Sequence, residues 1–88
     1  MRRSKIGIIH DILKSISDKG GTILPTHLLY KSNLSHQRMK GYIEELKGKN
    51  LLEEKQENTK LVYHLTDEGY HFLTKYKQLK EFTEAFGL

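Results

Sequence analysis

The sequence predicts a small α+β fold that is mostly α-helical, and three observations lead to this prediction. Apolar residues recur at helical spacing near both ends of the 88-residue chain. Between these segments, residues 31–35 combine lysine, serine and asparagine in a way that ends one helix and starts another. After residue 50, apolar and polar residues alternate, which is typical of strands. We therefore expect three helices, a two-stranded hairpin and a last helix.

The first helix is expected to begin after Ser4, whose hydroxyl can accept a hydrogen bond from a free backbone N–H. Its inward face consists of apolar residues at helical spacing: Ile6, Ile9, Leu13 and Ile16. Ile8 and Ile12 widen this face, so the helix should pack on more than one neighbour. Gly20 or Gly21 is expected to end it, because glycine readily adopts the left-handed conformation of a helix C-terminus.

A second helix is expected to start at Pro25, where the missing proline N–H has no cost. It follows a short extended segment, residues 22–24. The side chains expected to face inward are Leu28, Leu29 and Tyr30. The Lys-Ser-Asn sequence of residues 31–33 ends the helix, since asparagine tolerates the left-handed geometry of a tight turn.

The third helix is expected to run from its N-cap, Ser35, to about residue 49. Leu34 should fill the angle between this helix and the second one. The inward face consists of Met39, Tyr42, Ile43 and Leu46. Two helices joined by a turn of three to four residues form a helix-turn-helix.

The rest of the chain is expected to form a hairpin and a long helix. Residues 51–56 and 60–65 are the predicted strands, joined by a loop at 57–59. On the second strand, Leu61, Tyr63 and Leu65 share one face. Thr66 is the expected N-cap of the last helix, in which Tyr70, Leu73 and Tyr76 should cover the core. The acidic side chains near its start complement the positive end of the helix: Asp67 and Glu68.

Positive charge is concentrated in one region of a chain whose net charge is +4. Between residues 19 and 42 there is no aspartate or glutamate. The cations of this region are Lys19, Lys31, Arg38 and Lys40, and Arg2, Arg3 and Lys5 add a basic start to the chain. A segregated basic region is typical of proteins that bind a polyanion. Double-stranded DNA is therefore the partner that we expect.

The outward face of the third helix is the candidate reader of DNA. With the apolar side chains turned inward, Gln37, Gly41 and Glu44 point outward, flanked by Arg38 and Lys40. Glutamine can pair with adenine, and arginine with guanine, in the major groove. Gly41 costs about 1 kcal/mol relative to alanine, and close approach of the backbone to DNA would explain that cost. An ordinary solvated helix face is the alternative.

Two further segments are expected at the DNA backbone. The start of the second helix, at Thr26, offers free N–H groups to a phosphate, with a simple helix cap as the alternative. Arg2 and Arg3 form either an arm along the backbone or an unordered basic start. The residues expected to contact DNA are Arg2, Arg3, Thr26, Lys31, Ser35, His36, Gln37, Arg38, Lys40, Gly41 and Lys60.

Three helices followed by a two-stranded wing make a winged helix-turn-helix, and the sequence resembles one group of such proteins. It is similar to the small archaeal winged-helix DNA-binding regulators in the segments RRSKIGIIHDIL, THLLYKSNLSHQRMKGYIEEL and YHLTDEGYHFL. This resemblance covers residues 2 to about 79. It implies a DNA-binding transcription regulator or chromatin-like protein, cellular or carried by a plasmid or virus. Accordingly, residues 1–66 are expected to form the DNA-binding domain, with 67–88 as an extended C-terminal helix.

The wing departs from what this family resemblance implies. Acidic residues outnumber basic ones in it: Glu53, Glu54 and Glu57 stand against Lys55 and Lys60. A wing that binds phosphates strongly should be more basic. We therefore expect the wing to contribute less to DNA binding than the third helix.

The last helix carries Leu79, Phe82 and Phe86 at positions i, i+3 and i+7, beyond the reach of so small a core. The resemblance implies dimerisation through this helix, as in several members of the family. We therefore expect a homodimer, with Ile8 or Ile12 at the edge of its interface. The alternative is that the end of the helix folds back onto Ile8 and Ile12 of the first helix.

Several other function classes find no support in the sequence. The chain has no cysteine, and its five histidines follow no metal-binding spacing. No catalytic triad or glycine-rich phosphate loop is evident, so we expect no enzyme activity, no metal and no cofactor. No apolar run is long enough to span a membrane. We expect a cytoplasmic protein, associated with the nucleoid if it is cellular. A winged-helix adaptor that binds other proteins is the alternative function.

Overall fold

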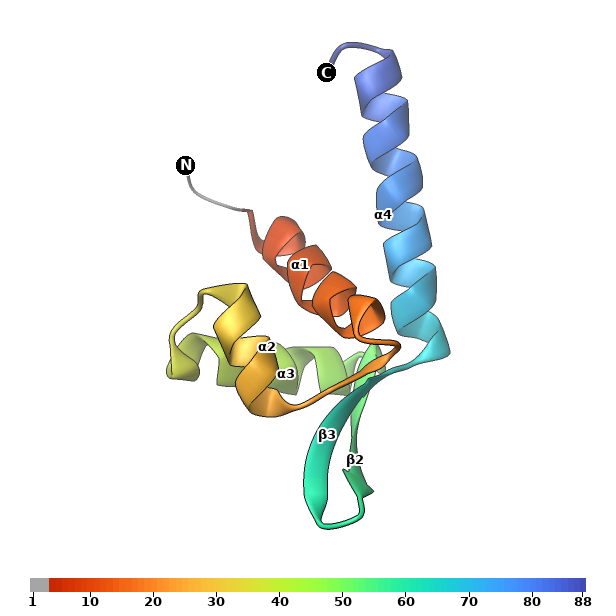
Figure 1. The fold of residues 1–88 in the computed structure, drawn as a ribbon. Coiled ribbons are helices and arrows are strands. Elements are labelled where there is room, and N and C mark those ends of the chain that lie inside the picture. The colour runs from red at the N-terminus through yellow and green to blue at the C-terminus, as the bar shows by residue number, and fades with distance from the viewer. Residues whose placement is uncertain (1–3) are drawn as a thin grey trace.

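The computed structural model describes residues 4–88 and shows the expected succession of elements (Figure 1). In chain order, these elements are α1 (Lys5–Asp18), β1 (Thr22–Ile23), α2 (Pro25–Ser32), α3 (His36–Gly48), β2 (Leu52–Glu57), β3 (Lys60–Leu65) and α4 (Asp67–Ala85). Helices α1, α2 and α3 pack together, and the β2–β3 hairpin extends from one side of them. Helix α4 leaves on another side, with its C-terminal end projecting beyond the rest of the chain. The predicted α+β fold, a winged helix-turn-helix with an extended last helix, is confirmed.

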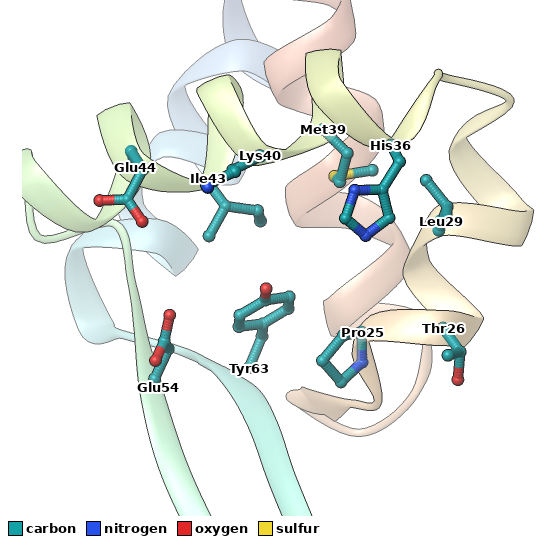
Figure 2. Close-up of a pocket in the computed structure, with 10 residues that line it drawn as sticks. All are labelled: Pro25, Thr26, Leu29, His36, Met39, Lys40, Ile43, Glu44, Glu54 and Tyr63. Atoms are coloured by element: carbon teal, nitrogen blue, oxygen red, sulfur yellow. The ribbon is translucent and has the colours of Figure 1, made fainter.

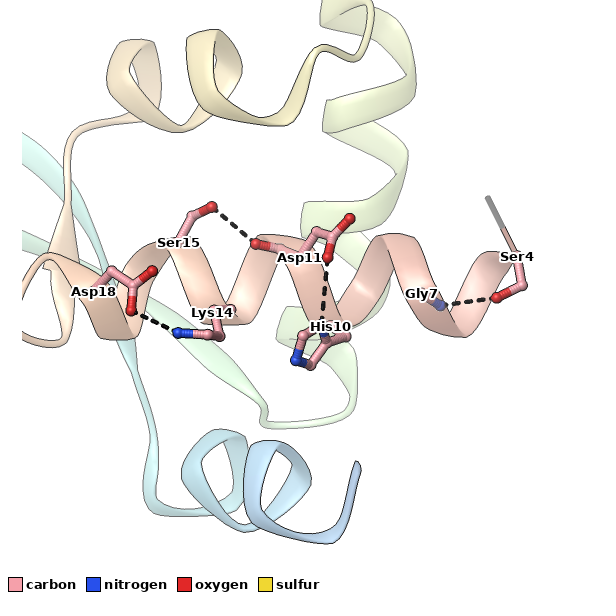
Figure 3. A network of polar contacts seen from close by, with 7 residues as sticks. All are labelled: Ser4, Gly7, His10, Asp11, Lys14, Ser15 and Asp18. Carbon is pink, nitrogen blue, oxygen red and sulfur yellow. Dashed lines mark hydrogen bonds and ion pairs between the residues drawn. The ribbon is translucent and has the colours of Figure 1, made fainter. Parts of the chain in front are cut away.

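Local sequence signals set the ends of α1. The hydroxyl of Ser4 accepts a hydrogen bond from the N–H of Gly7 at 3.1 Å (Figure 3), as expected of an N-cap. At the other end, Gly20 and Gly21 both have positive φ, and their N–H groups donate to carbonyls of the last helical turn. This arrangement needs a residue in the left-handed region, so the predicted glycine cap is confirmed.

The turn between α2 and α3 is also set by its own residues. Asn33 adopts the left-handed conformation at the C-cap of α2, with φ of 56°. The hydroxyl of Ser35 accepts a hydrogen bond from the N–H of Arg38 at 3.2 Å, which confirms it as the N-cap of α3. Leu34 is buried between the two helices, as predicted. The turn therefore fixes the orientation of α3 relative to α2.

A three-stranded antiparallel sheet closes the fold, with the strand order β1-β3-β2. The segment predicted as extended, residues 22–24, supplies β1, in which Thr22 pairs with His64. In the hairpin, Glu57 pairs with Lys60, so only Asn58 and Thr59 form the turn. The expected three-residue loop was therefore one residue too long, because Asn58 takes up positive φ and reverses the chain at once.

Helix α1 lies at the centre of the core and packs against α2, α4, β1 and β3. This confirms the expectation of more than one neighbour. The buried apolar cluster consists of Ile8, Ile9, Ile12, Leu13, Ile16, Ile23, Leu28, Leu34, Met39, Ile43, Leu46, Leu52 and Leu65. Leu29, Tyr42, Leu51, Tyr63, Phe72 and Leu73 pack partly buried against this cluster. The base of the hairpin and the start of α4 are thus anchored to the three-helix core.

Three side chains that the sequence placed on the core are exposed instead. Ile6 lies in the first turn of α1 and is half exposed. Tyr30 is 88% exposed on the outer side of α2. Tyr70 is exposed on α4, while Phe72, which the sequence did not single out, packs on the core together with Leu73. Helical spacing alone was wrong here because each helix touches its neighbours over only part of its length.

On β3, the face of the strand that is buried changes along its length. Leu65 is buried near the core, but Leu61 is exposed toward the tip of the hairpin. Val62, on the opposite face, is buried instead and lines a hollow together with Ile23 of β1. Leu61, Tyr63 and Leu65 therefore alternate along the strand as predicted, but this face is not buried along its whole length because the outer half of the hairpin extends past the core (Figure 1).

Gly69 packs so closely against the base of the hairpin that alanine should not fit. An added Cβ would lie 2.3 Å from the carbonyl oxygen of Leu51 and 2.5 Å from Cδ1 of Leu65. We expect Gly69→Ala to lower the free energy of unfolding in urea by about 1–3 kcal/mol, the usual cost of overpacking.

The matched control is Gly41→Ala on α3, because nothing lies within 4 Å of a Cβ at Gly41. That variant should be up to about 1 kcal/mol more stable than the unmodified chain, since glycine is a poor helix former. Equal urea midpoints for Gly69→Ala and the unmodified chain would contradict the close packing.

Candidate nucleic-acid interface

The first turns of α3 form the outward face that the sequence predicted. Met39, Ile43 and Leu46 are buried and hold the helix on the core. The residues on the other side of these turns are exposed: His36, Gln37, Arg38, Lys40 and Gly41. Gly41 presents bare backbone there, with open space at the position of a Cβ. A narrow, polar and basic helix surface therefore faces outward.

The start of α2 lies beside the start of α3, across a groove (Figure 2). The N-cap of α2 is Leu24, which makes no side-chain capping hydrogen bond, so the first N–H groups of α2 have no side-chain acceptor there. Thr26 at this end lines the same groove as His36 and Lys40 of α3. The structure thus brings together three of the residues that the sequence predicted to contact DNA.

This groove has a volume of about 340 Å³ and lies between α2, α3 and the hairpin (Figure 2). Its lining is largely apolar, with polar groups at the rim. The lining residues are Pro25, Thr26, Leu29, His36, Met39, Lys40, Ile43, Glu44, Glu54 and Tyr63. In the close-up, Glu44 and Glu54 lie toward one side of the groove, and His36 and Thr26 toward the other.

Three cations of the predicted interface have no acidic partner in the part of the chain that the structure describes. Lys31, Arg38 and Lys40 are exposed, and none of them forms an ion pair with any residue in 4–88. Nearby acidic groups, in contrast, are paired with other lysines, as in Glu45 with Lys5 at 2.9 Å. Positive charge at the start of α3 is therefore left available to an external anion.

Lys60 does not join this groove. It lies on β3 next to the hairpin turn and lines a separate hollow on the other side of the sheet. Lys19 and His27, which were not among the predicted DNA contacts, also line this hollow. They come from segments far apart in sequence, so no local pattern could have grouped them with Lys60.

Two of the residues expected at the interface, Arg2 and Arg3, lie outside the described residues. Lys5, just after them, is held by Glu45 of α3 and shares a shallow hollow with Arg38 and Gly41. The first turn of α1 therefore lies next to the outward side of α3.

The apolar stripe of α4 is exposed on the single chain. Leu79, Phe82 and Phe86 have exposed fractions of 60–67%, and the ring centroids of the two phenylalanines lie 4.9 Å apart. Ile8 and Ile12 are buried in the core. The expectation that either one lies at the edge of a dimer interface is therefore wrong, and so is the alternative in which the helix end folds back onto them.

The direction of α4 explains this exposure. The ring of His10 on α1 stacks against Tyr76, with centroids 4.1 Å apart, and this contact fixes the first half of α4 on the core. Beyond it, α1 and α4 diverge (Figure 1), so no part of the core is available to cover the second half of α4.

Within residues 4–88, no group of three or more histidine, aspartate or glutamate side chains is placed to hold a metal ion. None of the helices in this part of the chain combines the length and the apolar character needed to cross a bilayer.

Comparison with known proteins adds to this geometry. A family model described as winged helix-turn-helix matches residues 2–84. The fold is similar to that of Sso10a-2, a DNA-binding protein from Sulfolobus solfataricus, with a TM-score of 0.79 and 21% identity over 96% of this chain and 85% of that one. It is also similar to BpsR of Bordetella bronchiseptica, whose DNA binding is regulated by 6-hydroxynicotinic acid, with a TM-score of 0.70 and 20% identity over 86% of this chain and 58% of that one. Among curated proteins, none matches this chain.

Proposed function

The chain belongs to the winged helix-turn-helix family, and we propose on that premise that it binds double-stranded DNA as a transcriptional regulator in the cytoplasm. The observation that carries the proposal is the start of α3, where the exposed side chains of Gln37, Arg38 and Lys40 have no partner among residues 4–88. The similarity to a DNA-binding protein, Sso10a-2, agrees with it. The role is one of binding, and it requires neither a cofactor nor catalysis.

In this proposal, the first turns of α3 enter the major groove, which is wide enough to admit a helix. Gln37 and Arg38 are the candidate readers of base edges, since glutamine suits adenine and arginine suits guanine. Gly41, one turn later, allows the helix backbone to lie close to the DNA because it has no side chain on that face.

Other residues around α3 are proposed to contact phosphates and so to set its position. Thr26 contributes through the uncapped start of α2, which favours an anion. The remaining proposed contacts are Arg2, Arg3, Lys31, Ser35, His36, Lys40 and Lys60.

We further propose a homodimer formed by residues 67–88. Helix α4 has 19 residues and is therefore about 28 Å long at 1.5 Å per residue. Pairing two copies antiparallel through Leu79, Phe82 and Phe86 would cover the exposed stripe and keep the two recognition helices apart. Two-fold symmetry is the commonest form of oligomer. Half-sites about 34–36 Å apart, one turn of DNA, would suit such a dimer.

The test is selection of bound fragments from a pool of random duplexes by the purified chain. Retention of duplex DNA is expected, and enrichment of a repeated pair of short motifs would identify the half-sites. If no DNA is retained near physiological salt, the DNA-binding function is wrong. A protein-binding adaptor, the other known use of the same fold, would then be the function to pursue.

The wing is expected to contribute less than α3 to binding. Lys60 lies away from the groove that holds Thr26 and Lys40, and it is paired across the hairpin with the acidic residue Glu57. Lys40→Ala should therefore reduce affinity for a selected duplex more than Lys60→Ala does, measured at equal salt by fluorescence anisotropy. A larger loss for Lys60→Ala, in a variant with unchanged thermal stability, would make the wing a principal contact.

A further inference from the structure

Among residues 4–88, one side-chain ion pair connects α3 to the wing. The ammonium of Lys47, in the last turn of α3, lies 2.7 Å from Oε1 of Glu54 on β2. It also lies 3.6 Å from a carboxylate oxygen of Glu44, one turn earlier on α3. Within residues 4–88, no other ion pair or side-chain hydrogen bond joins α3 to the strands of the hairpin.

The Lys47–Glu54 ion pair lies at one side of the groove between α3 and the wing. Glu44 and Glu54 both line the groove, on the side away from Thr26 and His36 (Figure 2). Tyr63 faces α3 across the groove from β3. Apolar packing holds the base of the hairpin through Leu52 and Leu65, but at Glu54 the ion pair with Lys47 is what connects strand and helix.

The position of Glu44 matters for an anionic ligand. Lys40, Glu44 and Lys47 occur at i, i+4 and i+7, so they lie along one side of α3. Without Lys47, the carboxylate of Glu44, one turn from Lys40, and that of Glu54, which lines the same groove, would lose the cation that pairs with them. Charges one helical turn apart, about 5.4 Å, are only partly screened at ordinary ionic strength, where the Debye length is about 8–10 Å.

The ammonium of Lys47 interacts with the carboxylates of both Glu54 and Glu44. The hydrogen bond that Lys47 donates to Glu54 is the main cause that raises the pKa of Lys47 above its usual value, and the charges of Glu54 and Glu44 act in the same direction. Its side chain is 32% exposed, and its ammonium is already bound by two carboxylates. Lys47 is thus poorly placed to serve as a phosphate contact of its own.

We propose that Lys47 is a positioning residue for DNA binding, which holds the wing at its angle to α3 and keeps Glu44 and Glu54 from repelling the DNA backbone. This inference rests on the proposed DNA-binding function. It assigns a role to an ion pair that no local sequence pattern indicates, and it explains how an acidic wing can lie beside a helix that binds DNA.

The test is a charge exchange, with Lys47→Glu, Glu54→Lys and the double variant that carries both. The first readout is hydrogen exchange of the backbone amides of residues 53–57 and 60–64 in the DNA-free protein. We expect faster exchange in Lys47→Glu, because two like charges would then oppose each other. The double variant restores an attractive pair at the same net charge, so its hairpin amides should return to the exchange rates of the unmodified chain.

The second readout is the dissociation constant for a selected duplex at fixed salt. Lys47→Glu should weaken binding on the order of tenfold or more, and the double variant should recover most of that loss, as expected of coupled charges. Lys49→Glu is the matched control, since it makes the same charge change two residues away at an exposed lysine with no ion pair among residues 4–88. It should weaken binding less than Lys47→Glu does.

Two outcomes would overturn the inference. Unchanged hairpin exchange in Lys47→Glu would mean that the ion pair does not hold the wing. Failure of the double variant to recover affinity, with its hairpin exchange restored, would make Lys47 a direct contact to DNA. If the unmodified chain binds no duplex, the proposed function fails, while the exchange experiment still tests whether Lys47 holds the wing.

Discussion

The double variant Phe82→Glu/Phe86→Glu is expected to sediment as a folded monomer under conditions where the unmodified chain sediments as a dimer. Both rings are exposed on the single chain, so the fold does not depend on them. Buried against a second copy, each would contribute roughly 1.5–3 kcal/mol, and a glutamate there would place an unpaired charge in the interface. The monomers should bind DNA more weakly and lose any preference for paired half-sites.

The matched control for this variant is Lys77→Gln/Lys80→Gln. It changes the net charge by the same amount, and these two exposed lysines lie away from the apolar stripe on the helical wheel of α4. The control should remain a dimer. Sedimentation of the unmodified chain as a monomer at tens of micromolar would contradict the dimer, whatever the variants do.

Arg38→Ala is expected to cost about 1–3 kcal/mol of specific DNA binding if the arginine reads a base, and Gln37→Ala should relax specificity at one position. Arg38 is exposed and has no ion pair among residues 4–88, so its loss should leave thermal stability unchanged. The measurement is anisotropy titration of a selected duplex and of a duplex changed at one base pair.

Lys49→Ala is a suitable control for Arg38→Ala, because it removes one positive charge from the other end of the same helix. It should affect the selected and the changed duplex equally and weakly. Unchanged affinity in both Arg38→Ala and Gln37→Ala would remove α3 as the reader of sequence.

Much of the fold could be predicted because its boundaries are set locally. Ser4, Ser35 and Thr66 each accept a hydrogen bond from a backbone N–H two or three residues into the following helix, and Asn33 takes the left-handed conformation at a helix end. Such caps depend on a few adjacent residues, so the sequence alone reveals them. The order of helices and strands followed from these signals together with the period of the apolar residues.

What the sequence could not predict depends on which elements meet in space. Tyr30 has the helical spacing of an inward residue, yet no neighbour reaches that side of α2. At the candidate interface, periodicity was enough to find the outward face of α3. The separation of Lys60 from the groove and the pairing of Lys47 with Glu54 both depend on the position of the hairpin, for which no local pattern exists.

The salt dependence of DNA binding by the unmodified chain tests the proposed function. For B-form DNA, the logarithm of the binding constant falls with the logarithm of salt concentration with a slope of about −0.9 per phosphate neutralised. Lys31, Arg38 and Lys40 have no ion pair among residues 4–88, and a dimer would carry two sets of them. We therefore predict a steep slope, which corresponds to about six or more neutralised phosphates. A slope near zero, or no binding to duplex DNA near physiological salt, would contradict a DNA-binding role for α3.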